Sequence, residues 1–387
     1  MRTFPPLEIE RLVTLDRRRA VAAAAVMPQL EGCGRRDGPS SRSRPDQKER
    51  AELAARVLVA TWREAGLAGC ARKLRAAVWM GLPVLVAGRR TAQSVGAYFD
   101  LITDDGRLFY GDSFHLGYFP HGDESLGEAL DAHTDLVAEL ARVKAAGRVL
   151  DVGCGIAAPA LRIARRYGCR VTGVNISREQ VRQGRELIAA RGLSARVTIQ
   201  RGDARALEFP DGSFDAIVCV EAAGDICVSE HDKDRLVGEL FRLLRPGGHV
   251  GFSDLVLRTC PLPAEDRALR AVLYHSGAEL LTDWPAIFAR HDFRVVECRD
   301  IITATLPTWE HARAVYERHD GKVTRRYGRR LVQRILAHLE LIPGVLAARG
   351  SFPVLCAQKP AAAEGSPRPP HAVRQTPLSS HGGKEAT

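Results

Sequence analysis

The stretch Val149-Leu-Asp-Val-Gly-Cys-Gly155 joins an apolar strand to a glycine turn, and it decides the fold class. A strand buried inside a parallel sheet needs apolar residues on both faces, which this stretch supplies. Gly153 and Gly155 carry no Cβ, so the main chain can pass close to a ligand. The helix expected from Ala157 onward presents its free N–H groups there. The stretch therefore predicts either a turn that binds a nucleotide-like cofactor or an ordinary strand-to-helix turn.

Strand-like and helix-like segments alternate along the middle of the chain, which is typical of an α/β protein whose parallel sheet is covered on both faces. The late segments 294–302 and 352–357 lack a long crossover helix, so we expect them to pair as an antiparallel edge. The expected strands cover 148–152, 170–174, 196–201, 214–220 and 249–255, and the expected helices cover 157–167, 178–191 and 231–244.

The excess of positive charge lies outside the expected sheet. The formal charge is +10, residues 1–90 hold 18 Lys or Arg against 9 Asp or Glu, and residues 361–387 hold 3 against 2, which leaves 35 of each sign between 91 and 360. A balanced core does not indicate a surface that tracks phosphates, so we expect no nucleic-acid partner. We expect a disordered or linker-like basic extension over 1–50, an accessory helix over 51–90 and a disordered tail over 361–387.

Cysteine content and apolar runs bear on the compartment. None of the nine cysteines forms a C-x-x-C pair, which predicts neither a zinc site nor a disulfide scaffold and fits a cytoplasmic protein. The longest apolar runs, 20–27 and 76–88, fall short of the ~20 residues that a membrane span needs. Arginines before the first run resemble a signal peptide, but no convincing cleavage site follows. We expect no membrane span.

Polar residues follow the expected strands where an open α/β sheet binds its ligand, beyond the carboxyl ends of the strands. A side chain after the second strand can bond ribose hydroxyls, and one after the third can accept from an adenine amino group. Ser177 and Gln180 open the next helix with a capping-box pattern. The spacing suits an adenosyl group lying across the strand ends. The expected cofactor-binding residues are Asp151, Gly153, Cys154, Gly155, Asn175, Ile176, Gln180, Asp203, Ala204 and Glu221.

A nicotinamide dinucleotide is the main competitor for this turn, because Gly153-Cys-Gly-Ile-Ala-Ala158 also fits G-x-G-x-x-A. Against it, Asn175 stands where such sites carry an acid, and the chain has a single glycine turn of this type. The Pro246-Gly-Gly248 turn before the fifth strand is also more typical of methyltransferases. We therefore favour methyl transfer over an NAD(P)-dependent oxidoreductase.

From about residue 94 to 359 the chain resembles the class I methyltransferases that use S-adenosylmethionine, and within them the small-molecule group of tocopherol, sterol and geranyl diphosphate C-methyltransferases and sugar O-methyltransferases. The resemblance implies a Rossmann-like seven-stranded, mostly parallel sheet with an antiparallel edge strand, and a methyltransferase domain over 91–360. The chain departs from the family at Ala157, where a third glycine is usual, and at Asn175, where an acid is usual. The matching stretches are Gly111–Phe119, Val149–Pro159, Val171–Val181, Gly202–Ala204, Phe209–Asp215 and Leu244–Gly248.

The chemistry that this resemblance implies is methyl transfer to oxygen or carbon of a small, secondary-metabolite acceptor. The protein aligns the reactants and excludes water; no metal is obligatory, and a base is needed where the acceptor loses a proton. Related sugar O-methyltransferases carry an Asp at the end of the fifth strand, matched by Asp254, and a His shortly after the fourth, where Gly224 stands beside Asp225. We predict Asp254 as the base, then Asp225, with Glu221 and His275 as further candidates.

An aromatic cluster before the first strand forms the expected lid. In related enzymes this region closes over the cofactor and excludes water, and plain hydrophobic packing is the alternative. A later insertion around Trp309 resembles prenyl diphosphate and tocopherol C-methyltransferases, which leaves a terpenoid or other hydrophobic acceptor open. The expected substrate and lid residues are Tyr98, Tyr110, Phe114, His115, Tyr118 and Trp309.

Other functions stay open at this point: N-methylation of a small amine, cofactor binding without catalysis, and nucleic-acid methylation through the basic N-terminal segment. The expected assembly is a monomer or a homodimer.

Overall fold

The computed structural model describes residues 91–273, 281–321, 324 and 329–361. The extension and accessory helix expected before residue 91, the tail expected after residue 361, and His275 lie outside these residues. None of the described helices combines the length and the apolarity that a bilayer crossing needs.

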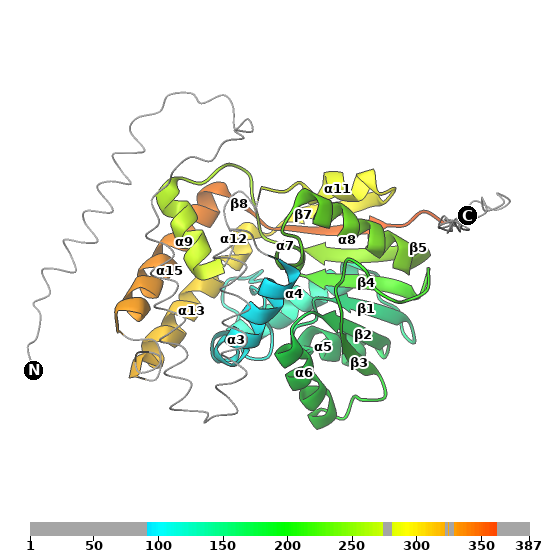
Figure 1. Cartoon of the computed structure of the whole chain (residues 1–387), viewed down its shortest axis with the longest axis horizontal. Helices are drawn as coiled ribbons and strands as arrows, with labels where there is room; N and C mark the ends of the chain where they lie inside the picture. Colours follow the sequence, from blue (N-terminus) through cyan, green and yellow to red (C-terminus); the bar gives the residue numbers. More distant parts are fainter. Residues whose placement is uncertain (1–90, 274–280, 322–323, 325–328, 362–387) are drawn as a thin grey trace, which may run out of the picture. The chain divides into compact units, whose positions relative to one another are not determined.

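Seven strands form one sheet in the order β3-β2-β1-β4-β5-β9-β7 (Figure 1). Neighbours from β3 to β5 pair in parallel, and β9 runs antiparallel to both β5 and β7. The predicted mixed sheet is confirmed, and its antiparallel strand lies one place in from the edge strand. Strand order reverses between β1 and β4, so a ligand crevice is expected there. The strands are β1 (Arg148–Val152), β2 (Arg170–Asn175), β3 (Val197–Arg201), β4 (Phe214–Val220), β5 (Leu244–Ser253), β7 (Arg294–Asp300) and β9 (Pro353–Gln358).

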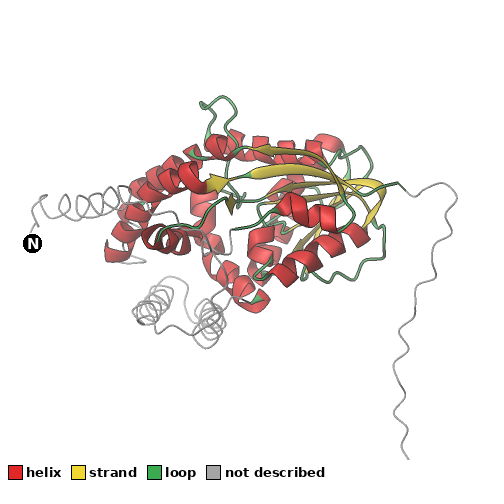
Figure 2. Cartoon of the chain, turned by 90° about the horizontal axis from the view of Figure 1, so that it is seen from above, coloured by secondary structure: helices red, strands yellow, loops and turns green. Residues whose placement is uncertain are grey.

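Helices cover both faces of the sheet (Figure 2). Side chains of α4, α5 and α6 join one buried apolar cluster, and those of α8 and α11 join a second. β1 contributes to both, with Val149 in the first cluster and Leu150 in the second, as expected for a strand buried on both faces. These helices are α4 (Leu126–Leu140), α5 (Ala158–Tyr167), α6 (Arg178–Ala190), α8 (Glu230–Leu243) and α11 (Trp284–Arg290).

A further group of helices lies beside the carboxyl ends of the strands (Figure 1). α3 packs against both α6 and α13, and α15 packs against α9 and α13. This group therefore closes the end of the sheet at which the crevice opens. It comprises α3 (Ala92–Tyr110), α9 (Pro263–Leu273), α12 (Ile302–Thr305), α13 (Pro307–Arg318) and α15 (Arg329–Arg349), with the short α7 (Ala223–Ile226) and the strand pair β6 (Val256–Leu257) and β8 (Gly350–Ser351) nearby.

Candidate active site

A cavity lies at the carboxyl ends of the central strands and is lined on its other side by α3. Asp151 and Cys154 do not line it, because both are buried behind the glycine turn. Tyr118 also lies elsewhere, packed against the apolar cluster on the α4 side of the sheet. The predicted residues that do line the cavity are Tyr98, Tyr110, Phe114, His115, Gly153, Gly155, Asn175, Ile176, Gln180, Asp203, Ala204, Glu221, Asp225, Asp254 and Trp309.

The glycine turn takes a backbone that side chains disfavour. Gly153 has φ +74°, and a Cβ there would lie 2.3 Å from the Cβ of Ala222, so this position requires glycine. The main-chain N–H of Gly153 donates to the carbonyl oxygen of Val174 at 2.9 Å, which joins the turn to the end of β2. Ala157, where the family has its third glycine, also takes a left-handed conformation with φ 75°. The departure noted in the sequence therefore leaves a strained backbone at the start of α5.

Asp151 supplies an unpaired carboxylate oxygen behind this turn. Its side chain is 1% exposed, and its Oδ2 has no hydrogen-bond partner. Burial raises the pKa of Asp151 to about 7. Burial likewise raises the pKa of the neighbouring Cys154 thiol, which packs against Gly173, so this cysteine belongs to the core.

The end of β2 leaves a buried donor unused. Asn175 accepts from the N–H of Ser177 at 2.9 Å through its Oδ1 and donates to Gln180 Oε1 at 2.8 Å through its Nδ2. Gln180 Nε2 is buried without an acceptor, although the side chain lines the cavity. The capping box expected here is half correct: the Ser177 hydroxyl accepts from the N–H of Gln180, but the Gln180 side chain bonds Asn175 instead. An unused amide donor beside a ligand cavity fits the ribose of an adenosyl group.

The acid after β3 has a partner that the sequence did not reveal. Both carboxylate oxygens of Asp203 accept from the Arg205 guanidinium, at 2.9 and 2.7 Å, and Arg205 also pairs with Asp232. Burial pushes the pKa of Asp203 upward, but the bonds from Arg205 outweigh it and hold that pKa below its usual value. Asp203 is therefore ionised and oriented, and each oxygen can still accept from an adenine amino group.

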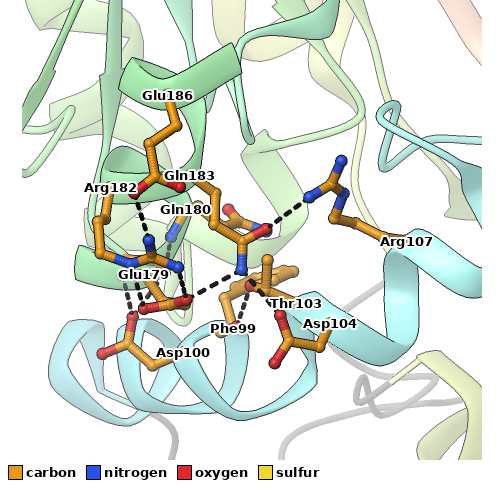
Figure 3. Close-up of polar contacts among 11 residues, drawn as sticks. Phe99, Asp100, Thr103, Asp104, Arg107, Glu179, Gln180, Arg182, Gln183 and Glu186 are labelled. Carbon is orange, nitrogen blue, oxygen red and sulfur yellow. Dashed lines mark hydrogen bonds and ion pairs between the residues drawn. The ribbon is translucent and has the colours of Figure 1, made fainter.

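Polar bonds fasten α3, which carries the predicted lid residues Tyr98 and Tyr110, to α6 (Figure 3). Asp100 accepts from the Ser177 hydroxyl at 2.6 Å, at the start of α6. One turn further on, the Gln183 side chain donates to Asp104 at 2.8 Å and accepts from Arg107 at 3.2 Å. The aromatic side chains of Tyr98 and Phe99 on the same helix line the cavity, so these bonds hold an apolar wall over it.

Three carboxyl groups meet on the other side of the cavity. Glu221 has φ 49°, and its Oε2 accepts from the main-chain N–H of Leu116 at 2.6 Å. Burial, then repulsion from Asp254 and Asp225, raises the pKa of Glu221 well above its usual range, although that hydrogen bond opposes the rise. Asp254 instead accepts two main-chain N–H bonds, from Gly224 at 2.5 Å and from Leu255 at 2.9 Å. All three carboxyls line the same cavity, and main-chain N–H groups hold Glu221 and Asp254 in place there.

The comparisons with known proteins agree with this geometry. A family described as "Methyltransferase domain" matches residues 149–248, which begin in β1 and end in the Pro-Gly-Gly segment of β5.

Among the described residues, no group of three His, Cys, Asp or Glu side chains is placed to hold a metal ion.

Curated relatives extend the match. "Methyltransferase GfsG" of Streptomyces halstedii is 32% identical over 222 residues, covering 56% of this chain and 78% of that protein. "27-O-demethylrifamycin SV methyltransferase" of Amycolatopsis mediterranei (strain S699) is 29% identical, covering 59% of this chain and 83% of that protein. Among solved structures, the [4+2]-cyclase SpnF matches with a TM-score of 0.60 at 28% identity, covering 71% of this chain and 98% of that one.

The matched family and the relatives are methyltransferases, which rules out the nicotinamide alternative. Asn175, which stands where a nicotinamide site carries an acid, agrees with them. Gln180 Nε2, buried without an acceptor at the wall of the cavity, fits S-adenosylmethionine. The chain therefore belongs to the small-molecule methyltransferases that depend on S-adenosylmethionine.

Proposed function

We propose that this protein transfers a methyl group from S-adenosylmethionine to a hydroxyl oxygen of a bulky, largely apolar secondary metabolite, and that Asp254 takes the hydroxyl proton. The observation that carries this proposal is the placement of Asp254 in the cavity, where its carboxylate accepts two main-chain N–H bonds beside the Glu221 carboxyl. A carboxylate fixed in this way can accept the proton that a hydroxyl acceptor loses.

The other walls of the cavity support an apolar acceptor. Val95, Ile102, Ile226, Leu273 and Trp309 face it from four helices. The relative named for 27-O-demethylrifamycin SV methylates a hydroxyl of a large molecule, and sterol 24-C-methyltransferase of Eremothecium gossypii, 35% identical over 40% of either chain, is named for a sterol carbon. Transfer to carbon is the alternative outcome, and Asp225 is the alternative base.

We propose that the cofactor is held by the turn at Gly153 and Gly155, by Asn175 and Gln180 at its ribose, and by Asp203 at its adenine. When bound, it supplies an electrophilic methyl group on a positively charged sulfur. The lid helix α3 then excludes water, because its aromatic side chains cover the cavity. We also propose that residues 91–360 form the catalytic domain and that it acts in the cytoplasm.

A second candidate function is cyclisation without methyl transfer. It is favoured by the 28% identity to a protein named as a [4+2]-cyclase and by Gly224, which stands where related sugar O-methyltransferases place a histidine. A cyclase of this kind would need the cavity to shape an apolar substrate but would need no base.

Turnover with a radiolabelled methyl donor separates the two. The full chain is incubated with S-[methyl-¹⁴C]adenosylmethionine and, in turn, 27-O-demethylrifamycin SV, a sterol and a primary amine, and S-adenosylhomocysteine binding is followed by thermal shift. We expect stabilisation by S-adenosylhomocysteine and label in a hydroxylated acceptor. Label in the amine alone would overturn the acceptor class. Stabilisation with no label in any acceptor, and an unlabelled isomer formed from a polyene, would support the cyclase.

A further inference from the structure

Four residues from separate parts of the fold form a closed cycle of hydrogen bonds behind Glu221. Ser253, the last residue of β5, accepts the main-chain N–H of Glu221 through its carbonyl oxygen at 2.8 Å, and its hydroxyl lies 3.0 Å from His133 Nε2. His133 Nδ1, on α4, lies 2.7 Å from the carbonyl oxygen of Leu116. The main-chain N–H of Leu116 donates to Glu221 Oε2, which closes the cycle.

The acceptors in this cycle fix the histidine tautomer. A carbonyl oxygen only accepts, so His133 Nδ1 must donate to Leu116 and the neutral ring must accept from the Ser253 hydroxyl at Nε2. His115 Nδ1 also donates to the same carbonyl at 2.9 Å. Both imidazoles are buried, and burial lowers the pKa of His133 to about 3 and that of His115 to about 4. The two rings therefore stay neutral across the working range, and the cycle does not change its hydrogen bonds with pH.

The cycle matters because no regular element holds Leu116. The residue lies in the segment between α3 and α4, so its orientation depends on the bonds to its main chain. The two imidazoles hold the Leu116 carbonyl, and on the other side of the same Cα the Leu116 N–H donates to the Glu221 carboxyl, so Leu116 is held from both of its peptide groups. Glu221 itself takes a left-handed backbone that costs free energy unless neighbours enforce it, and the Ser253 carbonyl is one such neighbour.

We propose that His133 is a positioning residue: through the Leu116 main chain it sets the orientation and proton affinity of Glu221, without touching the substrate. The inference rests on the proposed function only in taking Glu221 as part of the reactive cavity. The charged or titratable groups that face Glu221 are Asp254 after β5, Asp225 on α7 and Tyr110 on α3. Two of them push its pKa upward, and the Leu116 N–H is the hydrogen bond that pulls it back.

A pair of amide variants tests which ring nitrogen matters. In His133→Asn the side-chain NH₂ takes the place of Nδ1 and can still donate to Leu116, whereas in His133→Gln the amide sits near the place of Nε2 and cannot. The protonation of Glu221 is followed by infrared difference spectra over a pH series, with the Glu221→Gln protein subtracted so that one carboxyl is observed. His249→Asn, which changes a buried histidine in the middle of β5, is the matched control.

We expect His133→Gln to move the Glu221 titration to higher pH and to lower kcat about tenfold with little change in the KM for S-adenosylmethionine, because a misplaced group costs mainly the chemical step. His133→Asn should restore both readouts, and His249→Asn should leave both unchanged. If Gln and Asn variants titrate alike, the positioning role is wrong. The infrared shift needs no turnover, so it stands or falls separately from the methyl-transfer proposal.

Discussion

The cavity has two halves that are built in different ways. The cofactor half consists of main-chain turns at the ends of β1, β2 and β3, with glycines where a Cβ would collide and short polar side chains that bond their close neighbours in sequence. The other half, named the acceptor half for the proposed function, contains the carboxyls of Glu221, Asp225 and Asp254, and several of the hydrogen bonds that shape it join distant segments. Leu116 and Glu221 are 105 residues apart, and Gly117 and its partner Thr308 are 191 apart.

Under the proposed function, this difference makes one half of the site general and the other specific. Main-chain turns that hold an invariant cofactor tolerate little change, because each depends on one backbone conformation. Side chains assembled from the lid segment, α4, α7 and α13 can vary independently, so they can adapt to different acceptors without moving the turn. Variants that separate cofactor binding from turnover are therefore the sharpest way to test the division.

The largest expected effect is on turnover, at Asp254. Asp254→Asn removes the proposed base, so kcat should fall about 10²- to 10⁴-fold while the Kd for S-adenosylhomocysteine stays the same. Steady-state rates and calorimetry check the two halves separately. Asp225→Asn is the control, because it removes another carboxyl of the same cavity. We expect it to lower kcat less than Asp254→Asn does. Full turnover by Asp254→Asn would assign the base to another group.

The second prediction concerns Gly153, which should affect the cofactor half alone. Gly153→Ala places a Cβ 2.3 Å from Ala222 in a left-handed backbone, and the two effects together should cost roughly 2–5 kcal/mol of folding free energy. S-adenosylhomocysteine binding should be lost. Gly155 also has a positive φ, but the atom nearest to an added Cβ would be 3.8 Å away. Gly155→Ala should therefore cost only about 1–2 kcal/mol of folding free energy. Urea unfolding compares them, and equal losses would show that the contact with Ala222 is unimportant.

Asp151 should make the stability of the protein without cofactor depend on pH. Its pKa is raised to about 7, above that of the unfolded chain, so the native state keeps a proton that the unfolded state loses first. The free energy of unfolding should therefore fall as pH rises toward about 7, by roughly 4 kcal/mol at most. Asp151→Asn should flatten this slope in urea unfolding at several pH values. Glu186→Gln, an exposed control, should keep it; an unchanged slope in Asp151→Asn would contradict the assignment.

The sequence placed Gly153, Asn175 and Asp203 at the cavity because their geometry is local. Gly153, Asn175 and Asp203 each follow a strand, and the carboxyl ends of parallel strands meet at one edge of a sheet. The alternation of strand-like and helix-like segments predicted the sheet, including the antiparallel pair at its edge. The exact place of β9 did not, since the sequence pattern of 352–357 shows that a strand exists but not which neighbours it pairs with.

The acceptor half could not be predicted in the same way, because its partners are not neighbours in sequence. Nothing near His133 in the sequence marks it as a partner of Leu116 and Ser253. Tyr118 was predicted for the lid with the rest of its aromatic segment, but it is half-buried, packs against the apolar core and does not line the cavity. Burial and distance, rather than residue type, decide these roles.

The bond between the lid and α6 should have a moderate effect on cofactor affinity. Asp100→Ala removes the carboxylate that accepts from the Ser177 hydroxyl and from the main-chain N–H of Glu179, at a cost of about 1 kcal/mol, or roughly fivefold in the Kd for S-adenosylhomocysteine. Asp104→Ala breaks the lid contact with Gln183 and leaves the start of α6 intact, so its effect should be smaller. Calorimetry measures both. Equal affinities in Asp100→Ala and the parent protein would mean that α3 does not contribute to cofactor binding.

The smallest expected effect is a gain, at the residue that replaces the family's third glycine. Ala157 holds φ 75°, which costs an L-residue about 1–2 kcal/mol, whereas glycine adopts it freely. Glycine also gives the unfolded chain more freedom, about 0.4–1 kcal/mol, so Ala157→Gly should stabilise the protein by a net ~0.5–1 kcal/mol. Ala158→Gly, one residue on and inside α5, should instead destabilise by a similar amount. A higher unfolding temperature for Ala157→Gly and a lower one for Ala158→Gly would show that the Ala157 side chain strains the turn. Unfolding temperatures that change in the same direction would contradict this explanation.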